Sequence, residues 1–204
     1  MVATKAEFDK RYQEIEAFLT YLEGLEKHPG MSVSLMATMK ASVLLMIYNL
    51  VESTMTNIVQ AVFDHLSNKK IGFESVNDTV KELVLSNVKQ CNPKKLVEKM
   101  RGKSINMVEA SFNREDVFSG NIDGRKIRET LTSFGVSGSG RFDEPVLLEI
   151  KEARNDLAHG TKSFADAGKT YTSTDLRTKH TKVGKVLERA ISDFGKYLRN
   201  GAYA

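Results

Sequence analysis

Cysteine, proline and tryptophan are scarce in this chain of 204 residues, which has one cysteine, three prolines and no tryptophan. A single cysteine, Cys91, cannot close an intramolecular disulfide, and this favours a reducing compartment and a cytoplasmic location. The shortage of proline leaves long stretches free to continue as helix, and residues 34–66 contain neither proline nor glycine. Because strand-like alternation of apolar and polar residues is also scarce, the sequence predicts an all-α fold.

The chain also lacks a continuous hydrophobic run of membrane-spanning length. Its longest apolar stretch, Val43–Val51, is interrupted by Asn49 and is less than half of the roughly 20 residues that span a bilayer. Residues 1–10 alternate charged and apolar side chains and hold no hydrophobic core of the signal-peptide kind. We therefore expect no membrane partner and no export.

Sequence motifs for a metal ion or a nucleotide cofactor are missing. The chain has no CxxC pair, no HExxH and no GxxxxGK[ST] loop. The histidines are too far apart in sequence to suggest a local metal site, at His28, His65, His159 and His180. We therefore expect no metal and no other cofactor.

A strong excess of one charge is missing as well. Lysine and arginine number 30 against 26 aspartates and glutamates, and the formal net charge of +4 permits binding to a polyanion without requiring it. Basic residues gather in 94–103 and 177–185, but a solvated helix face explains such runs more often than contact with nucleic acid does. Composition alone leaves the partner open.

What the chain does have is apolar side chains at helical spacing. This spacing, with its capping residues and breakers, predicts helices over residues 7–25, 34–66, 76–88, 94–100, 123–134, 144–158 and 174–198. Residues 101–122 lack a firm period and residues 136–142 are rich in glycine and serine, so we expect both to be flexible. The length suits one domain over 1–204, a bundle of long antiparallel helices with shorter connecting helices.

The segment Arg154-Asn155-Asp156-Leu157-Ala158-His159-Gly160 combines a cation, an amide and an imidazole where a helix is expected to end. Arginine carries a forked, permanent charge that suits a phosphate, and histidine exchanges protons near neutral pH. Cleavage of RNA by transesterification needs a base for the 2′-OH, an acid for the departing 5′-oxygen and positive charge for the phosphorane. Arg154 and His159 can supply these roles without a metal ion.

The side chains of Arg154 and His159 diverge on a straight helix, since a separation of five residues corresponds to roughly 140° around the helix axis. Gly160 can end the helix and release the imidazole of His159, or two copies of the segment can face each other across a two-fold axis. The second arrangement needs a homodimer. The plain alternative makes His159 a helix cap and pairs Arg154 with Asp156 or Glu152 in a surface ion network.

A second candidate region lies on the long helix, which carries a polar stripe through apolar surroundings at Asn49, Ser53, Thr56 and Gln60. A hydrogen-bonded packing seam or a partly wet surface is the ordinary explanation of such a stripe. The alternative is that Asn49 and Ser53 line an RNA-binding cleft opposite Arg154, with Glu52 positioning the arginine. Tyr171, just before the last helix, either stacks on a base of the RNA or packs against the start of that helix.

The Arg154–His159 segment resembles the R-x4-6-H signature of HEPN domains, with Asn155 as the polar residue after the arginine. Three further segments resemble the bacterial MAE-type HEPN subgroup, and they are Tyr48–Met55, Asn121–Glu129 and the pair Ser163-Phe164 with Tyr171-Thr172. The likeness covers roughly residues 7–200. It implies a HEPN-type helical bundle that pairs through its signature helices.

In active members of this family, the resemblance implies a metal-independent endoribonuclease that leaves a 2′,3′-cyclic phosphate, commonly as a toxin with an antitoxin or as an antiviral effector. By position, Arg154 would contact the scissile phosphate, His159 would transfer protons, and Asn155 would orient the phosphate or the imidazole. The expected partners are RNA, a second copy of the chain and an antitoxin protein. Two alternatives stay open, a non-catalytic nucleotide-binding or protein-interaction module, and an antitoxin-sensitive sensor whose partner carries the toxicity.

Overall fold

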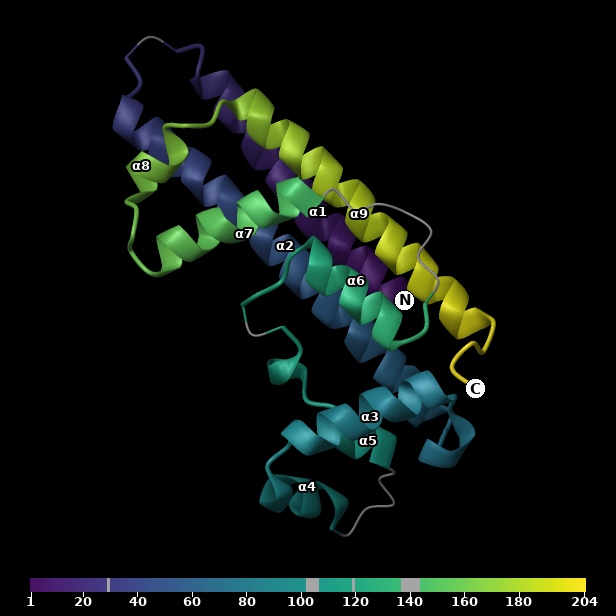
Figure 1. Ribbon diagram of the computed structural model, residues 1–204. Helices are drawn as coiled ribbons and strands as arrows, with labels where there is room; N and C mark the ends of the chain where they lie inside the picture. The colour runs from purple at the N-terminus through teal and green to yellow at the C-terminus, as the bar shows by residue number, and fades with distance from the viewer. Residues whose placement is uncertain (29, 102–106, 119, 137–143) are drawn as a thin grey trace.

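The computed structural model describes residues 1–204 except 29, 102–106, 119 and 137–143. Its described part contains helices and no strands, so the prediction of an all-α fold is confirmed. Three long helices form the body, α1 (Val2–Leu25), α2 (Val33–Asn68) and α9 (Ser173–Arg199) (Figure 1). The first begins five residues before the start that apolar spacing predicted, and the other two agree with prediction within two residues at each end.

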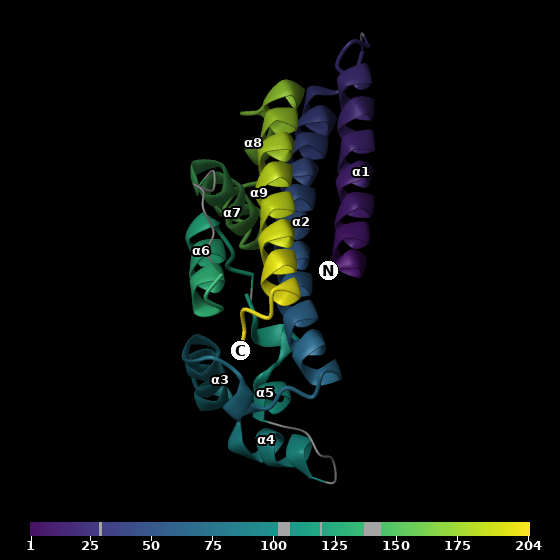
Figure 2. The ribbon, with the colours of Figure 1, turned by 90° about the vertical axis from the view of Figure 1, so that its right-hand side faces the viewer.

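Helix α2 is the centre of the molecule and carries much of the hydrophobic core. Its 36 residues contain no glycine or proline, and the Ser32 side chain caps the first turn by accepting a hydrogen bond from the Leu35 N–H. In Figure 2, α1 lies on one side of α2 and α9, and α6 and α7 lie on the other. By length and composition alone α2 could also cross a membrane, a test that the core helix of a soluble protein passes too. Here it contacts α1, α5, α7, α8 and α9.

Shorter helices connect the long ones, and they are α3 (Asp78–Gln90), α4 (Pro93–Met100), α5 (Met107–Ser111), α6 (Gly124–Ser133), α7 (Glu144–Ala158) and α8 (Phe164–Gly168). Helices α3, α4 and α5 form a lobe near the C-terminal end of α2 (Figure 2). Two single turns of 3₁₀-helix cover Phe73–Ser75 and Arg114–Asp116. Within residues 101–122, for which the sequence showed no firm helical period, α5 and the second 3₁₀ turn are short helical segments. Most of the glycine- and serine-rich stretch 136–142 lies outside the described residues.

Helix α8 was not predicted, and its place is set by contact with α2. A Cβ built on Gly168 would lie 1.8 Å from the Ala37 carbonyl oxygen, so the two backbones touch at this point. Only a glycine allows that approach. The contact fixes the segment that joins the end of α7 to the start of α9, where Thr172 and Asp175 form a capping box.

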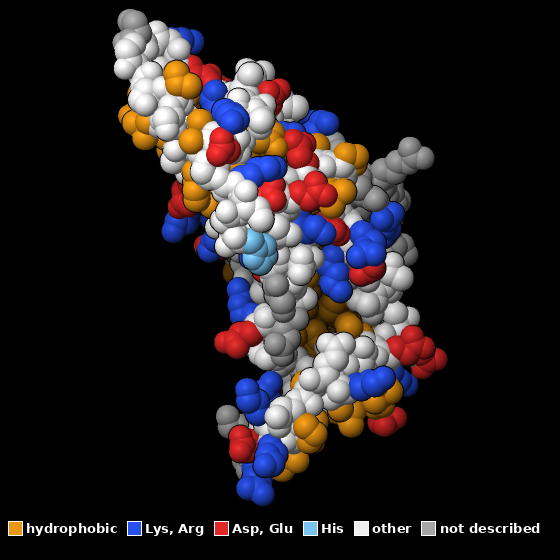
Figure 3. Space-filling model, turned by 60° about the vertical axis from the view of Figure 1, so that its left-hand side comes forward, with side chains coloured by type: hydrophobic (Ala, Val, Ile, Leu, Met, Phe, Trp, Pro, Cys, Tyr) orange, Lys and Arg blue, Asp and Glu red, His pale blue; other side chains and the backbone are white. Residues whose placement is uncertain are grey.

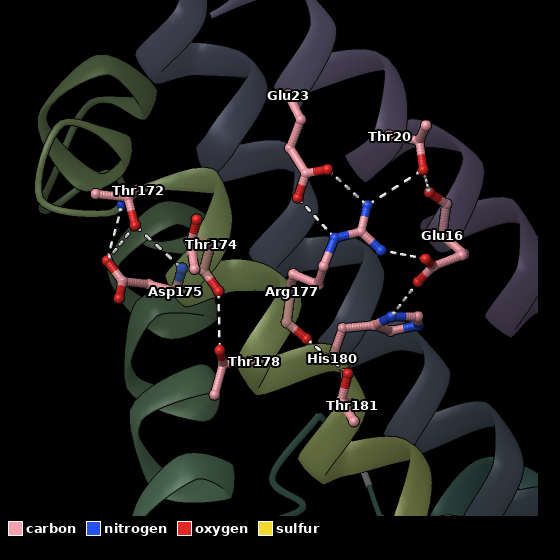
Figure 4. A network of polar contacts seen from close by, with 10 residues as sticks. All are labelled: Glu16, Thr20, Glu23, Thr172, Thr174, Asp175, Arg177, Thr178, His180 and Thr181. Atoms are coloured by element: carbon pink, nitrogen blue, oxygen red, sulfur yellow. Dashed lines mark hydrogen bonds and ion pairs between the residues drawn. The ribbon is translucent and has the colours of Figure 1, made fainter.

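An ion network joins α1 to α9 (Figure 4). The Arg177 guanidinium donates to Glu23 at 2.6 and 3.1 Å, to Thr20 at 3.1 Å and to Glu16. The pKa of Arg177 rises because Glu23 and then Glu16 bind its charged form, an effect that exceeds the opposing cost of burial. Two carboxylates therefore neutralise this arginine.

His180 lies one turn further along α9 and is fully buried. Its ring stacks on Tyr12 with 3.9 Å between ring centroids, and its Nδ1 lies 3.4 Å from a Glu16 oxygen. Burial lowers the pKa of His180, although the Glu16 carboxylate opposes the shift. The imidazole is therefore held neutral inside the bundle.

Candidate active site

Helix α7 ends where the sequence predicted, and the end has the geometry of a Schellman motif. Gly160 has φ +69°, the Gly160 N–H donates to the Leu157 carbonyl at 3.3 Å, and the Thr161 N–H donates to the Asp156 carbonyl at 2.9 Å. His159 occupies the cap position, and its side chain is exposed. Gly160 therefore ends the helix, as the first of the two predicted arrangements requires, and both arrangements stay predictions.

The Arg154 side chain runs back over α2 and is half-buried. Its guanidinium carbon lies 5.0 Å from the centre of the Tyr48 ring, and its Nη1 donates to the Asn155 side-chain oxygen at 3.0 Å. Among the described residues, no carboxylate lies within ion-pair distance of Arg154. Asp156 pairs with Lys162 at 2.6 Å instead, so the predicted surface ion network does not form around Arg154.

The backbone of Gly120 completes the surroundings of Arg154. Gly120 has φ +75°, and a Cβ built on it would lie 2.6 Å from Arg154 Nη2. The Gly120 N–H donates to Glu52 at 2.9 Å, and the Ile122 N–H donates to the Tyr48 hydroxyl at 3.3 Å. Burial raises the pKa of Tyr48, so the ring under the arginine stays neutral. Glu52 therefore holds the backbone of Gly120, which lies beside the Arg154 guanidinium, and its positioning of the arginine stays a prediction.

A buried ion pair holds the neighbouring turn of α7. Lys151 Nζ lies 2.5 Å from Asp123, whose other oxygen accepts from the Lys126 N–H at 2.9 Å and caps α6. Burial opposes ionisation of Asp123, but the bonds from Lys151 and Lys126 outweigh it and hold the pKa of that carboxyl below its usual range. Because Lys151 lies one turn before Arg154, this pair fixes the face of α7 from which the arginine extends.

The other predicted cleft residues are distributed along α2 and do not all meet Arg154. Asn49 is exposed, and Ser53 donates its hydroxyl to the Leu50 carbonyl at 3.3 Å in its own helix. Gln60 donates to Asp64 at 2.7 Å, also within the helix. Ser53 and Gln60 therefore bond within α2, and both are half-buried.

Tyr171 lies away from Arg154, on another side of α7. Lys179 Nζ lies 5.5 Å from the centre of its ring and 2.5 Å from Glu149. Burial and a hydrogen bond to Glu149 raise the pKa of Tyr171 to about 12. Glu149 and Arg154 are five residues apart, so they diverge by roughly 140° around the helix. The structure thus favours the packing role of Tyr171 over base stacking in the Arg154 cleft.

The site therefore brings together Arg154 and Asn155 with Tyr48, Glu52 and Gly120, and leaves His159 exposed at the helix end. Gly120 carried no signal in the sequence, because nothing in a lone loop glycine indicates which side chain its backbone will meet. Tyr48 was noted only as part of the segment Tyr48–Met55, which resembles the MAE-type HEPN subgroup. Among the described residues, no group of three His, Cys, Asp or Glu is placed to hold a metal ion.

An all-α fold with an arginine, an adjacent amide and a histidine at the end of a helix packed across the long central helix defines the HEPN class of domains. The model of the MAE_28990-like HEPN family matches residues 4–203, and the chain belongs to this family. Membership indicates a nuclease, RNA-related or nucleotide-binding role. No curated protein and no solved structure matches the chain.

Proposed function

We propose that this chain is an endoribonuclease that cleaves RNA by attack of the 2′-OH, without a metal ion, and that it serves as the toxin of a toxin–antitoxin or antiviral defence system. The observation that carries the proposal is the state of Arg154. Two neutral groups hold its guanidinium, the face of the Tyr48 ring and the side-chain oxygen of Asn155. The positive charge is therefore available for a phosphate. Family membership supports the same class of chemistry.

The reaction assigns a role to each group. The 2′-oxygen forms a bond to phosphorus while the bond from phosphorus to the 5′-oxygen breaks, which leaves a 2′,3′-cyclic phosphate. One His159 accepts the 2′-OH proton, and the same histidine of a second copy gives a proton to the 5′-oxygen. Arg154 stabilises the charge that develops on the phosphorane, and Asn155 keeps the guanidinium in place.

A homodimer follows from this need for two histidines. Leu148, Glu152, Asn155 and His159 recur at spacings of four, three and four residues, so they share one face of α7. Leu148 on that face is 44% exposed, and Phe164 on α8 is 39% exposed. Exposed apolar side chains on this face and on α8, which contacts α7, support pairing of two α7 helices across a two-fold axis.

The test is incubation of the purified chain with single-stranded RNA in the presence of EDTA. We expect new RNA ends from the wild type, loss of cleavage by a factor of about 10² or more in His159→Ala, and an unchanged rate in His28→Ala. His28 is also exposed and lies outside the site, which makes it a matched control. Cleavage by His159→Ala at the wild-type rate would refute the proposal.

A non-catalytic phosphate-binding module is the second candidate, and one observation favours it. Among the described residues, nothing bonds the His159 side chain, whereas a catalytic base is normally oriented by a third group. In that case the wild type generates no new ends but still binds RNA, and Arg154→Gln abolishes the binding. New RNA ends from the wild type, and RNA binding by the wild type and by Arg154→Gln, therefore distinguish the two functions.

A further inference from the structure

A pocket of about 290 Å³ opens between α3, α6 and the chain segment 111–118, above the floor that α2 provides. It lies outside the Arg154 site. Figure 3 shows it as a hollow with hydrophobic walls between the main body and the lobe that contains α3. Its apolar walls include Leu83, Phe112 and Phe118, and its polar rim includes Asn87 and Thr130.

The walls of the pocket suit a flat, neutral ligand. Phe112 is partly exposed and stacks on the buried Phe63 with 4.5 Å between ring centroids. Lys126 and Glu129 on the rim lie 3.6 Å apart, and the Glu129 carboxylate also lies 3.7 Å from Arg125, so the rim carries charges of both signs. Aromatic and apolar side chains for stacking, with amides and hydroxyls at the edge, form the combination that binds a nucleobase.

The volume limits the ligand to one ring system. Sites for drug-sized molecules start at roughly 300 Å³, so a cavity of about 290 Å³ takes a single base and excludes a duplex or a helix of a protein partner. The charged side chains of the rim, Lys126 and Glu129, have opposite signs, so the rim gives no particular advantage to a phosphate. A nucleobase satisfies size, shape and charge together.

The pocket and the Arg154 site share one loop and one helix. Phe118 lines the pocket, and Gly120, two residues later, touches the Arg154 guanidinium. Two residues span at most about 7 Å. On α2, Glu52 and the pocket residue Val59 are separated by about 10 Å of helix. A single RNA chain can therefore place a phosphate at Arg154 and a nearby base in the pocket.

We propose that this pocket binds one base of the substrate RNA beside the cleaved phosphate and thereby sets the preference for the cleavage site. The proposal rests on the proposed ribonuclease function. It makes Asn87 a specificity residue, because its amide both donates and accepts hydrogen bonds at the pocket rim.

Nucleosides test the pocket without the reaction. Adenosine, guanosine, cytidine and uridine carry no phosphate, so Arg154 contributes nothing to their binding. We expect one of them to shift the nuclear magnetic resonance signals of Leu83, Asn87 and Thr130, and Asn87→Asp to weaken that binding roughly tenfold. Gln13→Glu also replaces an amide by a carboxylate, but on the exposed face of α1, and we expect it to leave nucleoside binding unchanged. If no nucleoside shifts these signals, the proposal is wrong.

Mapping of cleavage sites tests the same pocket in the full protein. In the wild type, one base predominates at a fixed position beside the cut, and in Asn87→Asp that preference shifts to another base. Thermal melting of the variant identifies a folding defect. An unchanged preference in a folded variant overturns the proposal while the ribonuclease function stands. If the wild type cuts no RNA, the ribonuclease function fails, and the nucleoside titration decides whether the pocket binds a base.

Discussion

Two arginine–histidine pairs lie on different helices of this molecule, and the protein treats them in opposite ways. In α9, Arg177 is bound by Glu16 and Glu23 (Figure 4). His180 is buried against Tyr12. All the charge of that pair is used inside the protein. Its geometry explains how α1 is attached to α9 and offers nothing to a ligand.

At the end of α7, Arg154 and His159 form a second arginine–histidine pair, but no carboxylate of the described residues neutralises this arginine. The guanidinium rests on the Tyr48 ring and an amide, and the imidazole is exposed. The comparison teaches that the position of carboxylates, and not the presence of arginine and histidine, distinguishes a structural pair from a candidate catalytic one.

Replacement of each arginine by glutamine tests the comparison most strongly. Arg154→Gln should lower RNA cleavage about 10²–10³-fold, because the charge that stabilises the phosphorane is lost. It should lower the free energy of unfolding by about 1 kcal/mol, between the values of an exposed and a desolvated cation–π contact. The measurements are initial cleavage rates and denaturant unfolding.

Arg177→Gln should show the reverse. It leaves Glu16 and Glu23 without their partner between α1 and α9, and the free energy of unfolding should fall by about 1–3 kcal/mol. Cleavage per folded molecule should stay within about twofold, because this pair lies outside the site. Loss of cleavage in a folded Arg177→Gln protein would remove the distinction between the two pairs.

Two glycines with positive φ sharpen the assignment of Arg154. Gly120→Ala places a Cβ against Arg154 Nη2, whereas a Cβ on Gly201 meets nothing within 4 Å. Both changes strain the backbone by about 1–2 kcal/mol, so their effects on unfolding should be alike. Only Gly120→Ala displaces the guanidinium, and we expect it alone to lower cleavage, by about tenfold. Equal cleavage rates in the two variants would show that the position of Arg154 does not depend on Gly120.

The dependence of the free energy of unfolding on pH below neutrality tests the buried His180, and it is the smallest of the expected effects. Because burial lowers the pKa of His180, the unfolded chain binds a proton that the folded chain excludes once the pH falls below about 6.5. The free energy of unfolding should therefore decrease as the pH falls through that range, by up to about 1.4 kcal/mol per pH unit.

His180→Phe keeps a ring against Tyr12 and removes this titration. The difference between the two unfolding profiles reports the titration of His180 together with its contact to Glu16, since Arg177 and the other histidines are common to both proteins. We expect the wild-type profile to fall more steeply than the His180→Phe profile as the pH drops from 7 to 5. Parallel profiles from pH 7 to pH 5 would mean that His180 is not held neutral by the fold.

The long helices could be predicted from the sequence because the pattern that indicates a helix is local. Apolar residues at helical spacing and the caps around them lie within a few turns of one another, and Gly160 marked the end of α7 correctly. Helices α5 and α8 were missed, because each has five residues and owes its order to packing, such as that of Gly168 on Ala37.

The site divides in the same way. The contact between Arg154 and Asn155 joins neighbours in the chain and could be expected from the segment itself. The contacts of Arg154 with Tyr48 and Gly120 join α7 to α2 and to a loop, and no local pattern encodes them. The separation of Tyr171 from the arginine is also a tertiary fact, set by its bond to Glu149.

The most direct measurement uses an RNA with one 2′-deoxy nucleotide at a mapped cleavage position, incubated with the wild-type protein in EDTA. If the 2′-oxygen is the nucleophile activated by His159, cleavage at that bond disappears while cleavage at other sites in the same RNA continues at its normal rate. Cleavage that persists at the 2′-deoxy position would contradict the account.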